Sequence, residues 1–156
     1  MYFLIVGVLM FAAPLASIGI EYGVLHTSDD VVYLIGKWFV FWCVGARLLL
    51  AGLRQSFNPS FTAQSIFEID DPRVLPIVQE LGFHNLALGV LGVATLFNAT
   101  WIPAGALAGG LFYGLAGVKH IFGHAKNAER ITAMVSDLWA FVVLAGYLSG
   151  AYLTIA

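Results

Sequence analysis

Charged residues are scarce in this chain. Only 10% of its 156 residues are Asp, Glu, Lys or Arg, whereas 60% are hydrophobic. A soluble domain carries charge on about a quarter of its residues. So few charges cannot cover a surface that faces water, and we therefore expect the protein to lie in a lipid bilayer. The net charge of -2 provides no basic surface for nucleic acid, so we expect no nucleic-acid partner.

Cysteine is almost absent as well. The single cysteine, Cys43, excludes a disulfide within the chain, and thiols therefore give no information on the redox compartment. The N-terminal apolar run also lacks the Lys or Arg that precedes the core of a secretory signal peptide. We expect this run to be a retained first membrane span, with cleavage after Ala16 as the alternative.

Long apolar runs are abundant. A helix needs about 20 mostly apolar residues to cross the hydrocarbon core of a bilayer, which is about 30 Å thick. We predict an all-α integral membrane helical bundle, formed as a single domain over residues 1–156. The alternative is a bundle of four spans with an interfacial helix. The five predicted spans are roughly 2–25, 31–55, 74–97, 103–124 and 131–155.

The connection between the second and third predicted spans differs from the others. It reads SFNPSFTAQSIFEIDDPR, residues 56–73, and contains two prolines. Its centre predicts a short interfacial helix whose Phe and Ile side chains enter the headgroup layer while its carboxylates stay in water.

Basic residues near the span ends predict the orientation. Arg54 and Arg73 flank the second connection, and Lys126 and Arg130 flank the fourth, whereas the first and third connections contain no Lys or Arg. Cytoplasmic connections are enriched in these residues. We therefore expect the N-terminus to be cytoplasmic, in a bacterial inner membrane.

Several ionisable residues fall at similar predicted depths in the cytoplasmic half of the bilayer. A charge near the bilayer centre costs about 2.5–3.5 kcal/mol on insertion scales, so such residues usually face the bundle interior and mark functional sites. We predict that Glu80 pairs with Arg47 and that Asp137 pairs with Lys119. Glu21 and Lys37 are expected to form a structural pair in the outer half. The candidates for ligand binding or proton exchange are Arg47, Glu80, His84, Asn85, His120 and Asp137.

Two pairs of residues have a spacing that suits a metal. Glu80 and His84 are four residues apart, as are His120 and His124, so each pair lies on one helical face. Carboxylate and imidazole groups from two helices are ligands for iron or zinc. The four residues are therefore candidate metal ligands. The alternative is that these histidines are structural, with His124 reaching the headgroups.

Three functions fit these patterns. The first is a pocket for a small hydrophobic molecule, such as a quinone or a lipid-like compound, in a binding protein or redox-accessory subunit. The second is a structural or assembly subunit without a ligand, in a homo-oligomer or a larger membrane complex. The third is a metal-dependent membrane enzyme. Whether the protein is an enzyme at all stays open.

Several segments resemble a known group of sequences. They are RLLLAG (47–52), NPSFTAQSI (58–66), QELGFHNLALGVLGVATL (79–96), GLFYGLAGVKHI (110–121) and NAERITAMVSDL (127–138). Together they resemble an uncharacterised family of short bacterial multi-pass membrane proteins in the neighbourhood of DoxX-like proteins. The resemblance implies a compact helical bundle, with Arg47 and Glu80 at shared positions, and for some DoxX-like proteins an association with quinone-linked redox complexes. Five spans are predicted here, where four are usual.

Overall fold

Five long apolar helices make up most of the molecule. The computed structural model describes residues 2–26, 29–122 and 128–155. Within these residues all regular structure is helical, which confirms the predicted all-α membrane bundle, with five helices rather than four long enough to span. These five helices identify the chain as a multi-pass membrane protein. The spans are Tyr2–Val24, Val31–Phe57, Pro72–Ala94, Ala99–Ile121 and Ala128–Leu153.

Short π-helical segments occur within the first two spans without breaking them. The backbone at the joins keeps α-helical angles, so each span is continuous. The first span consists of α1 (Tyr2–Gly7), η1 (Val8–Ala12), α2 (Ala13–Gly19) and η2 (Ile20–Val24), and the second of α3 (Val31–Phe39), η3 (Val40–Ala46) and α4 (Arg47–Phe57).

The other three spans are regular α-helices, two of which begin with a 3₁₀ turn. The predicted short helix between the second and third spans is present as α5 and η4. The elements are α5 (Pro59–Phe61), η4 (Thr62–Ile66), η5 (Pro72–Val74), α6 (Leu75–Ala94), η6 (Ala99–Trp101), α7 (Ile102–Ile121) and α8 (Ala128–Ile155).

Asp and Asn side chains begin three of the spans. Asp30, Asp71 and Asn98 each accept a hydrogen bond from the backbone N–H two residues later, which satisfies a donor that has no partner within the helix. The side chain of Arg73 also donates to Asp71 and lowers the pKa of that carboxyl. These caps lie in the connections and fix where each span starts.

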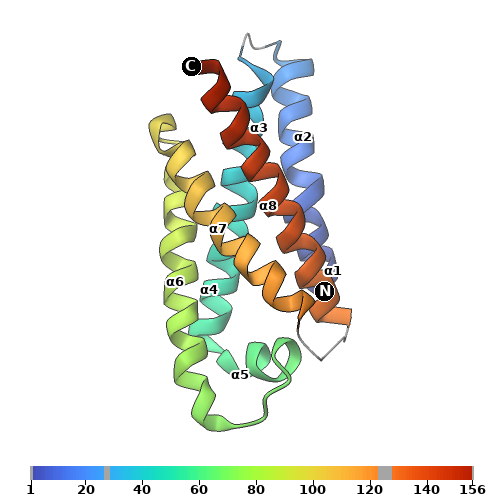
Figure 1. Ribbon diagram of the computed structural model, residues 1–156, viewed down its shortest axis with the longest axis vertical. Coiled ribbons are helices and arrows are strands. Elements are labelled where there is room, and N and C mark those ends of the chain that lie inside the picture. Colours follow the sequence, from blue (N-terminus) through green and yellow to red (C-terminus); the bar gives the residue numbers. More distant parts are fainter. Residues whose placement is uncertain (1, 27–28, 123–127, 156) are drawn as a thin grey trace.

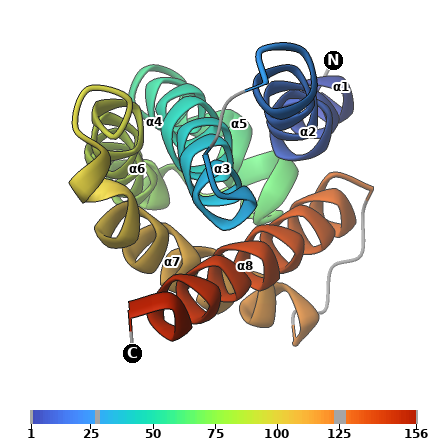
Figure 2. The same ribbon diagram turned by 90° about the horizontal axis from the view of Figure 1, so that it is seen from above.

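The spans alternate in direction. Figure 1 shows the N-terminus, α5, the last turn of α7 and the first turn of α8 at one end of the bundle, and the end of α8 at the opposite end. Seen from above, the second span lies between the first and third, and α7 and α8 cross its remaining side (Figure 2). The second span contacts all four others and supplies much of the buried core, including Leu34, Val40, Cys43, Val44 and Leu48.

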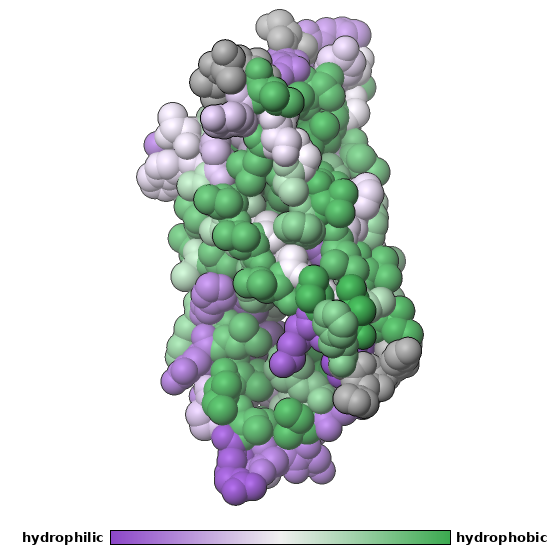
Figure 3. Space-filling model, viewed as in Figure 1, coloured by the Kyte–Doolittle hydropathy of each residue, from purple (hydrophilic) through white to green (hydrophobic). Residues whose placement is uncertain are grey.

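The surface agrees with a position in lipid. Figure 3 shows apolar side chains over the middle of the molecule and polar side chains at both ends. A further group of polar residues interrupts the apolar surface in the lower half of this face. That half contains the end of the bundle where α5 lies.

Glycines bring the second and third spans into backbone contact. A Cβ added at Gly92 would lie 2.3 Å from the backbone nitrogen of Gly45, and one at Gly52 would lie 2.7 Å from the carbonyl oxygen of Gly82. A Cβ at Gly89 would lie 2.6 Å from the nitrogen of Leu49. Small residues of this kind let membrane helices approach closely. The contacts fix the register between α6 and the second span.

Tryptophan side chains attach the first span to the bundle. Pro14 has no N–H, so the carbonyl of Met10 lacks the donor that an α-helix would supply. The indole nitrogen of Trp139 donates to this oxygen at 3.0 Å. Trp42 donates to the hydroxyl of Ser17 at 2.9 Å. The first span is therefore held from both the second and the fifth.

The predicted outer pair is confirmed. Lys37 Nζ lies 2.6 Å from Glu21 Oε1, and Trp38 Nε1 donates to Glu21 Oε2, also at 2.6 Å. Glu21 is only 9% exposed, and its carboxylate is thus compensated where lipid would not solvate it.

Candidate functional site

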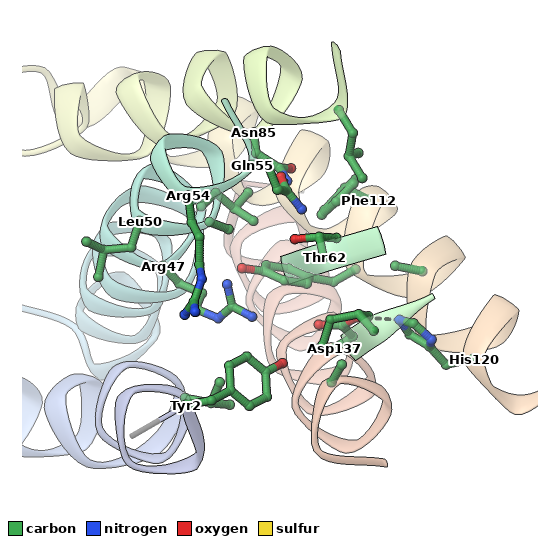
Figure 4. Close-up of a pocket in the computed structure, with 18 of the residues that line it drawn as sticks. Tyr2, Arg47, Leu50, Arg54, Gln55, Thr62, Asn85, Phe112, His120 and Asp137 are labelled. Carbon is green, nitrogen blue, oxygen red and sulfur yellow. Dashed lines mark hydrogen bonds and ion pairs between the residues drawn. The ribbon is translucent and has the colours of Figure 1, made fainter. Parts of the chain in front are cut away.

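A cavity of about 510 Å³ lies within the half of the bundle that contains α5. Its size falls within the range of about 300–1,000 Å³ that is usual for small-molecule sites. Residues from all five spans and from the α5–η4 segment line it (Figure 4). Residues far apart in the sequence therefore meet in this cavity.

One face of α4 forms a wall of the cavity. Arg47, Ala51, Arg54 and Gln55 follow the spacing of a single helical face, and all four line the cavity. The neighbouring face of the second span, which carries the glycines, packs against α6. The sequence of α4 thus combines a packing face with a polar face.

The opposite wall comes from α7 and α8. Tyr113, Ala116 and His120 lie on one face of α7, and Ala133 and Asp137 lie on one face of α8. The two alanines leave space between the larger side chains. The buried hydroxyl of Tyr113 donates to the backbone carbonyl of Cys43, which fixes the ring against the second span.

A cluster of ionisable groups occupies one side of the cavity. His120 Nε2 lies 3.8 Å from Asp137 Oδ2, and both side chains are 11% exposed. This distance is too long for a hydrogen bond but close enough for electrostatic attraction. The Arg47 guanidinium interacts with Asp137 and adjoins the hydroxyl of Tyr2. Figure 4 shows the Tyr2 hydroxyl and the Asp137 carboxylate directed toward the same space as the Arg47 guanidinium.

An amide pair lies on another side of the cavity. Asn85 Nδ2 donates to Gln55 Oε1 at 2.7 Å, and both residues are buried. Gln79 donates to the backbone carbonyl of Ser56 at 3.0 Å, close to the end of α4. These bonds join α4 and α6 in addition to their glycine contact.

Three lining side chains have buried polar atoms without a hydrogen-bond partner among the described residues. The atoms are Arg47 Nε, Asn85 Oδ1 and His120 Nδ1. A buried polar atom left without a partner costs about 1–3 kcal/mol, so such atoms in one cavity call for a specific explanation. They provide both donor and acceptor capacity for a bound molecule.

Two further cations line the cavity. The guanidinium carbon of Arg54 lies 3.5 Å from the centroid of the Phe61 ring, a cation–π contact that orients it over the α5–η4 segment. Lys119 lines the cavity and is exposed. Arg47, Arg54 and Lys119 carry three positive charges against the single carboxylate of Asp137, which gives a net charge of +2 without His120.

Four of the six candidate residues predicted from the sequence line this cavity: Arg47, Asn85, His120 and Asp137. Glu80 and His84 are exposed and are not among the lining residues. The ring of His84 packs against Phe112, which does line the cavity, at a centroid distance of 5.5 Å.

The predicted pairing of Arg47 with Glu80 is wrong. Among the residues that the structure describes, no ion pair joins them. The reason is the register of the two spans, since Gly89 packs against Leu49 and Gly82 packs against the last turn of α4. Glu80 therefore lies beside the end of α4, well away from the level of Arg47.

The predicted pairing of Asp137 with Lys119 is also different in the structure. Asp137 faces His120 and interacts with Arg47, whereas Lys119 is exposed at the neighbouring position of α7. Adjacent residues on a helix point in directions about 100° apart, so only one of Lys119 and His120 can face Asp137 closely.

The predicted metal ligands are not brought together within the described part of the chain. No group of three His, Cys, Asp or Glu residues there is placed to hold a metal ion. Glu80 and His84 face outward from α6, whereas His120 faces the cavity. His124 lies outside the described residues. The four-residue metal site stays a prediction.

Several lining residues were not predicted from the sequence: Tyr2, Arg54, Gln55, Thr62 and Tyr113. Lys119, which also lines the cavity, was predicted only as the partner of Asp137. Gln55 lies eight residues after Arg47, on the same helical face, and this spacing was a usable signal. Tyr2 gave no such signal, because its position depends on how the first span packs.

Comparisons with known proteins identify a family. The sequence model of a family described as "Family of unknown function (DUF6790)" matches residues 1–148. No curated protein and no solved structure matches the chain.

Proposed function

The chain belongs to DUF6790, a family of unknown function, and we propose from its own residues that it binds a small lipid-like molecule in the cavity. The binding would be the activity of a non-catalytic membrane protein or of a redox-accessory subunit.

The observation that carries this proposal is the group of buried polar atoms in the cavity. Arg47 Nε, Asn85 Oδ1 and His120 Nδ1 have no partner among the described residues, although they lie in one space of about 510 Å³. A purely structural polar layer would gain stability by pairing these atoms with each other. Their arrangement instead favours a ligand with polar atoms at one end.

The walls of the cavity suit the rest of such a molecule. Leu48, Leu50, Leu81 and Phe112 supply an apolar lining next to the polar cluster. Ligand sites commonly combine apolar walls with a few placed polar groups. A molecule with a polar head and a hydrocarbon portion fits this division.

His120 and Asp137 would have a second role in this site. Their 3.8 Å separation lets a proton pass between them through small side-chain movements or one water molecule. A redox-accessory role with a quinone rests on this pair and on the DoxX-like resemblance.

We infer that the end of the bundle with the cavity faces the cytoplasm of a bacterial cell. Arg54 lies in the last turn of α4, Arg73 in η5 and Arg130 in the first turn of α8. These helix ends lie toward α5, and cytoplasmic connections are enriched in basic residues. A ligand would then enter from the inner leaflet or the cytoplasm.

Cavity filling tests the proposal. Ala116→Phe places a large side chain in the cavity, and Ala104→Phe makes the same change at an exposed position of the same helix. Protein purified in mild detergent is extracted with organic solvent, and the extract is analysed by mass spectrometry. We expect a stoichiometric lipid or quinone in the wild type and in Ala104→Phe, and its loss from Ala116→Phe.

Two results would contradict the proposal. One is the absence of any stoichiometric small molecule from the wild type together with no affinity for added amphiphiles, which would favour a structural subunit. The other is equal retention in both variants. Helical content and thermal stability of each variant are measured in parallel, so that a loss of fold is recognised.

A further inference from the structure

The charges of the cavity point to the chemical class of its ligand. We propose that the bound molecule is an anionic amphiphile, whose carboxylate or phosphate group contacts Arg47 and Arg54 and whose hydrocarbon chain lies along the apolar wall. This inference rests on the proposed function and specifies its ligand.

The cavity carries an excess of positive charge. Three cationic side chains and one carboxylate line the cavity, which gives its lining a net charge of +2. Charges within a membrane protein are costly unless they are paired, and intramembrane arginines usually find anionic partners. Asp137 compensates only one of the three cations. An anionic headgroup would compensate a second.

Arg47 has unused hydrogen-bond donor capacity. Arg47 interacts with Asp137 and Tyr2, yet its Nε is buried without a partner among the described residues. A guanidinium has five N–H donors in a planar fork that matches carboxylate and phosphate groups. Arg47 therefore has a donor left for a second anion.

Arg54 is held in a position to act with Arg47. It lies seven residues along α4 on the same face, and the ring of Phe61 supports its guanidinium at 3.5 Å. Figure 4 shows the two arginine side chains extending toward the same part of the cavity. Two guanidinium groups on one side of a cavity form a site for an anion.

The cavity also has room for the hydrocarbon portion of such a ligand. Leu50 lines the cavity although 49% of its surface is exposed on the outside of α4. Phe67 likewise lines the cavity and is 37% exposed. The cavity therefore reaches the lipid-facing surface, and a chain longer than the cavity can continue into the bilayer. A free inorganic anion would leave the apolar wall unused.

Neutral and cationic amphiphiles fit less well. A quinone or a monoglyceride accepts hydrogen bonds but leaves the charge of +2 uncompensated, and an alkylamine adds to it. Asn85 Oδ1, which has no hydrogen-bond partner in the described part of the chain, would accept a hydrogen bond from a hydroxyl or a protonated oxygen next to the anionic group.

Binding of matched probes tests this inference. The full-length protein in dodecyl maltoside is titrated, with native mass spectrometry as readout, with oleate, oleoyl lysophosphatidate, monoolein and decylubiquinone. Inorganic phosphate is added as a competitor. We expect both anionic lipids to bind at least about tenfold more tightly than monoolein and decylubiquinone, because one hydrogen bond to a charged group contributes at least about 1.4 kcal/mol, to which a tenfold difference corresponds. Millimolar phosphate should weaken the anionic lipids only slightly.

Charge-neutralising variants identify the residues that produce the preference for anionic over neutral lipids. Arg54→Gln and Lys119→Gln remove cavity charges at exposed positions, so that folding is expected to persist. Arg73→Gln is the matched control, since Arg73 lies at the same end, outside the cavity lining, and pairs with Asp71 at 2.5 Å. We expect Arg54→Gln to lower the affinity for oleate about tenfold while monoolein binding is unchanged, and Arg73→Gln to leave both unchanged.

The outcomes separate this inference from the proposed function. The inference of an anionic headgroup would be rejected if neutral probes bound as tightly as anionic ones, or if neither Arg54→Gln nor Lys119→Gln changed the preference for anionic lipids. Either result would still agree with the proposal that the cavity binds a lipid-like molecule. Binding of phosphate without any preference for a hydrocarbon chain would overturn the amphiphile. Absence of binding by every probe would overturn both proposals.

Discussion

Asn85 and Gln55 share a buried hydrogen bond of 2.7 Å that crosses from α6 to α4 beside the cavity. The two side chains are 30 positions apart in the sequence and only 2% and 8% exposed. The bond holds one wall of the cavity to the helix that carries both arginines. It therefore connects the packing of the bundle with the geometry of the candidate site.

The first prediction concerns this amide pair. Asn85→Leu and Gln55→Met should each destabilise the detergent-solubilised protein by about 1 kcal/mol, because each leaves a buried polar group without its partner. The double variant should recover a coupling energy of about 0.6 kcal/mol, and at most about 1.7 kcal/mol. Reversible unfolding in mixed detergent measures all four proteins. Strictly additive effects would contradict the pairing.

The second prediction concerns Trp139. Trp139→Phe removes the donor to the Met10 carbonyl, which Pro14 has already deprived of its helical partner. We expect a loss of about 1–3 kcal/mol in the free energy of unfolding. Trp101→Phe, at a position that is 45% exposed, serves as the control and should change stability little. Equal effects of the two substitutions would argue against the carbonyl as the cause.

The third prediction compares two glycines. Gly92→Ala forces a Cβ to within 2.3 Å of the Gly45 nitrogen, so α6 must move away from the second span, at a cost of about 1–3 kcal/mol. Gly146→Ala meets no atom within 4 Å and should be neutral or stabilising by up to about 1 kcal/mol, since alanine favours the helix. Thermal unfolding in detergent measures both. A stable Gly92→Ala protein would show that the two spans are not in backbone contact.

The fourth prediction concerns orientation. In a Cys43→Ala background, a cysteine at Asp70 should react with a membrane-impermeant maleimide only after the cells are opened. A cysteine at Thr100 should react in intact cells. Both positions are exposed. Asp70 lies in the connection before η5, and Thr100 lies in η6, where the fourth span begins at the opposite end of the bundle. The reverse pattern would place the cavity at the outer side of the membrane.

The spans were predictable because the signal for a membrane helix is a local run of apolar residues in the sequence. A run of about 20 apolar residues identifies a membrane helix whatever its neighbours are. The predicted spans agree with the structure except at their ends, where caps such as Asp71 and Asn98 start a helix before the apolar run begins.

The candidate site was predictable only in part. The sequence indicates how deep a residue lies in the bilayer, but not in which direction its side chain points. Counting from span ends placed Arg47 and Glu80 at one level, but this count assumes that all spans start at the same height. The glycine contacts set a different register. In addition, α6 is apolar on most sides, so its sequence does not indicate whether Asn85 or His84 faces inward. The structure buries Asn85 and exposes His84.

The electrostatic attraction between Arg47 and Asp137 has a consequence for biosynthesis. Arg47 belongs to the second span and Asp137 to the fifth, so the arginine enters the membrane before the ribosome has made the carboxylate that compensates it. The second span must therefore insert with its arginine uncompensated by that carboxylate, at a cost of about 2.5–3.5 kcal/mol that its many apolar side chains offset. The cavity is complete only once the last span has joined the bundle.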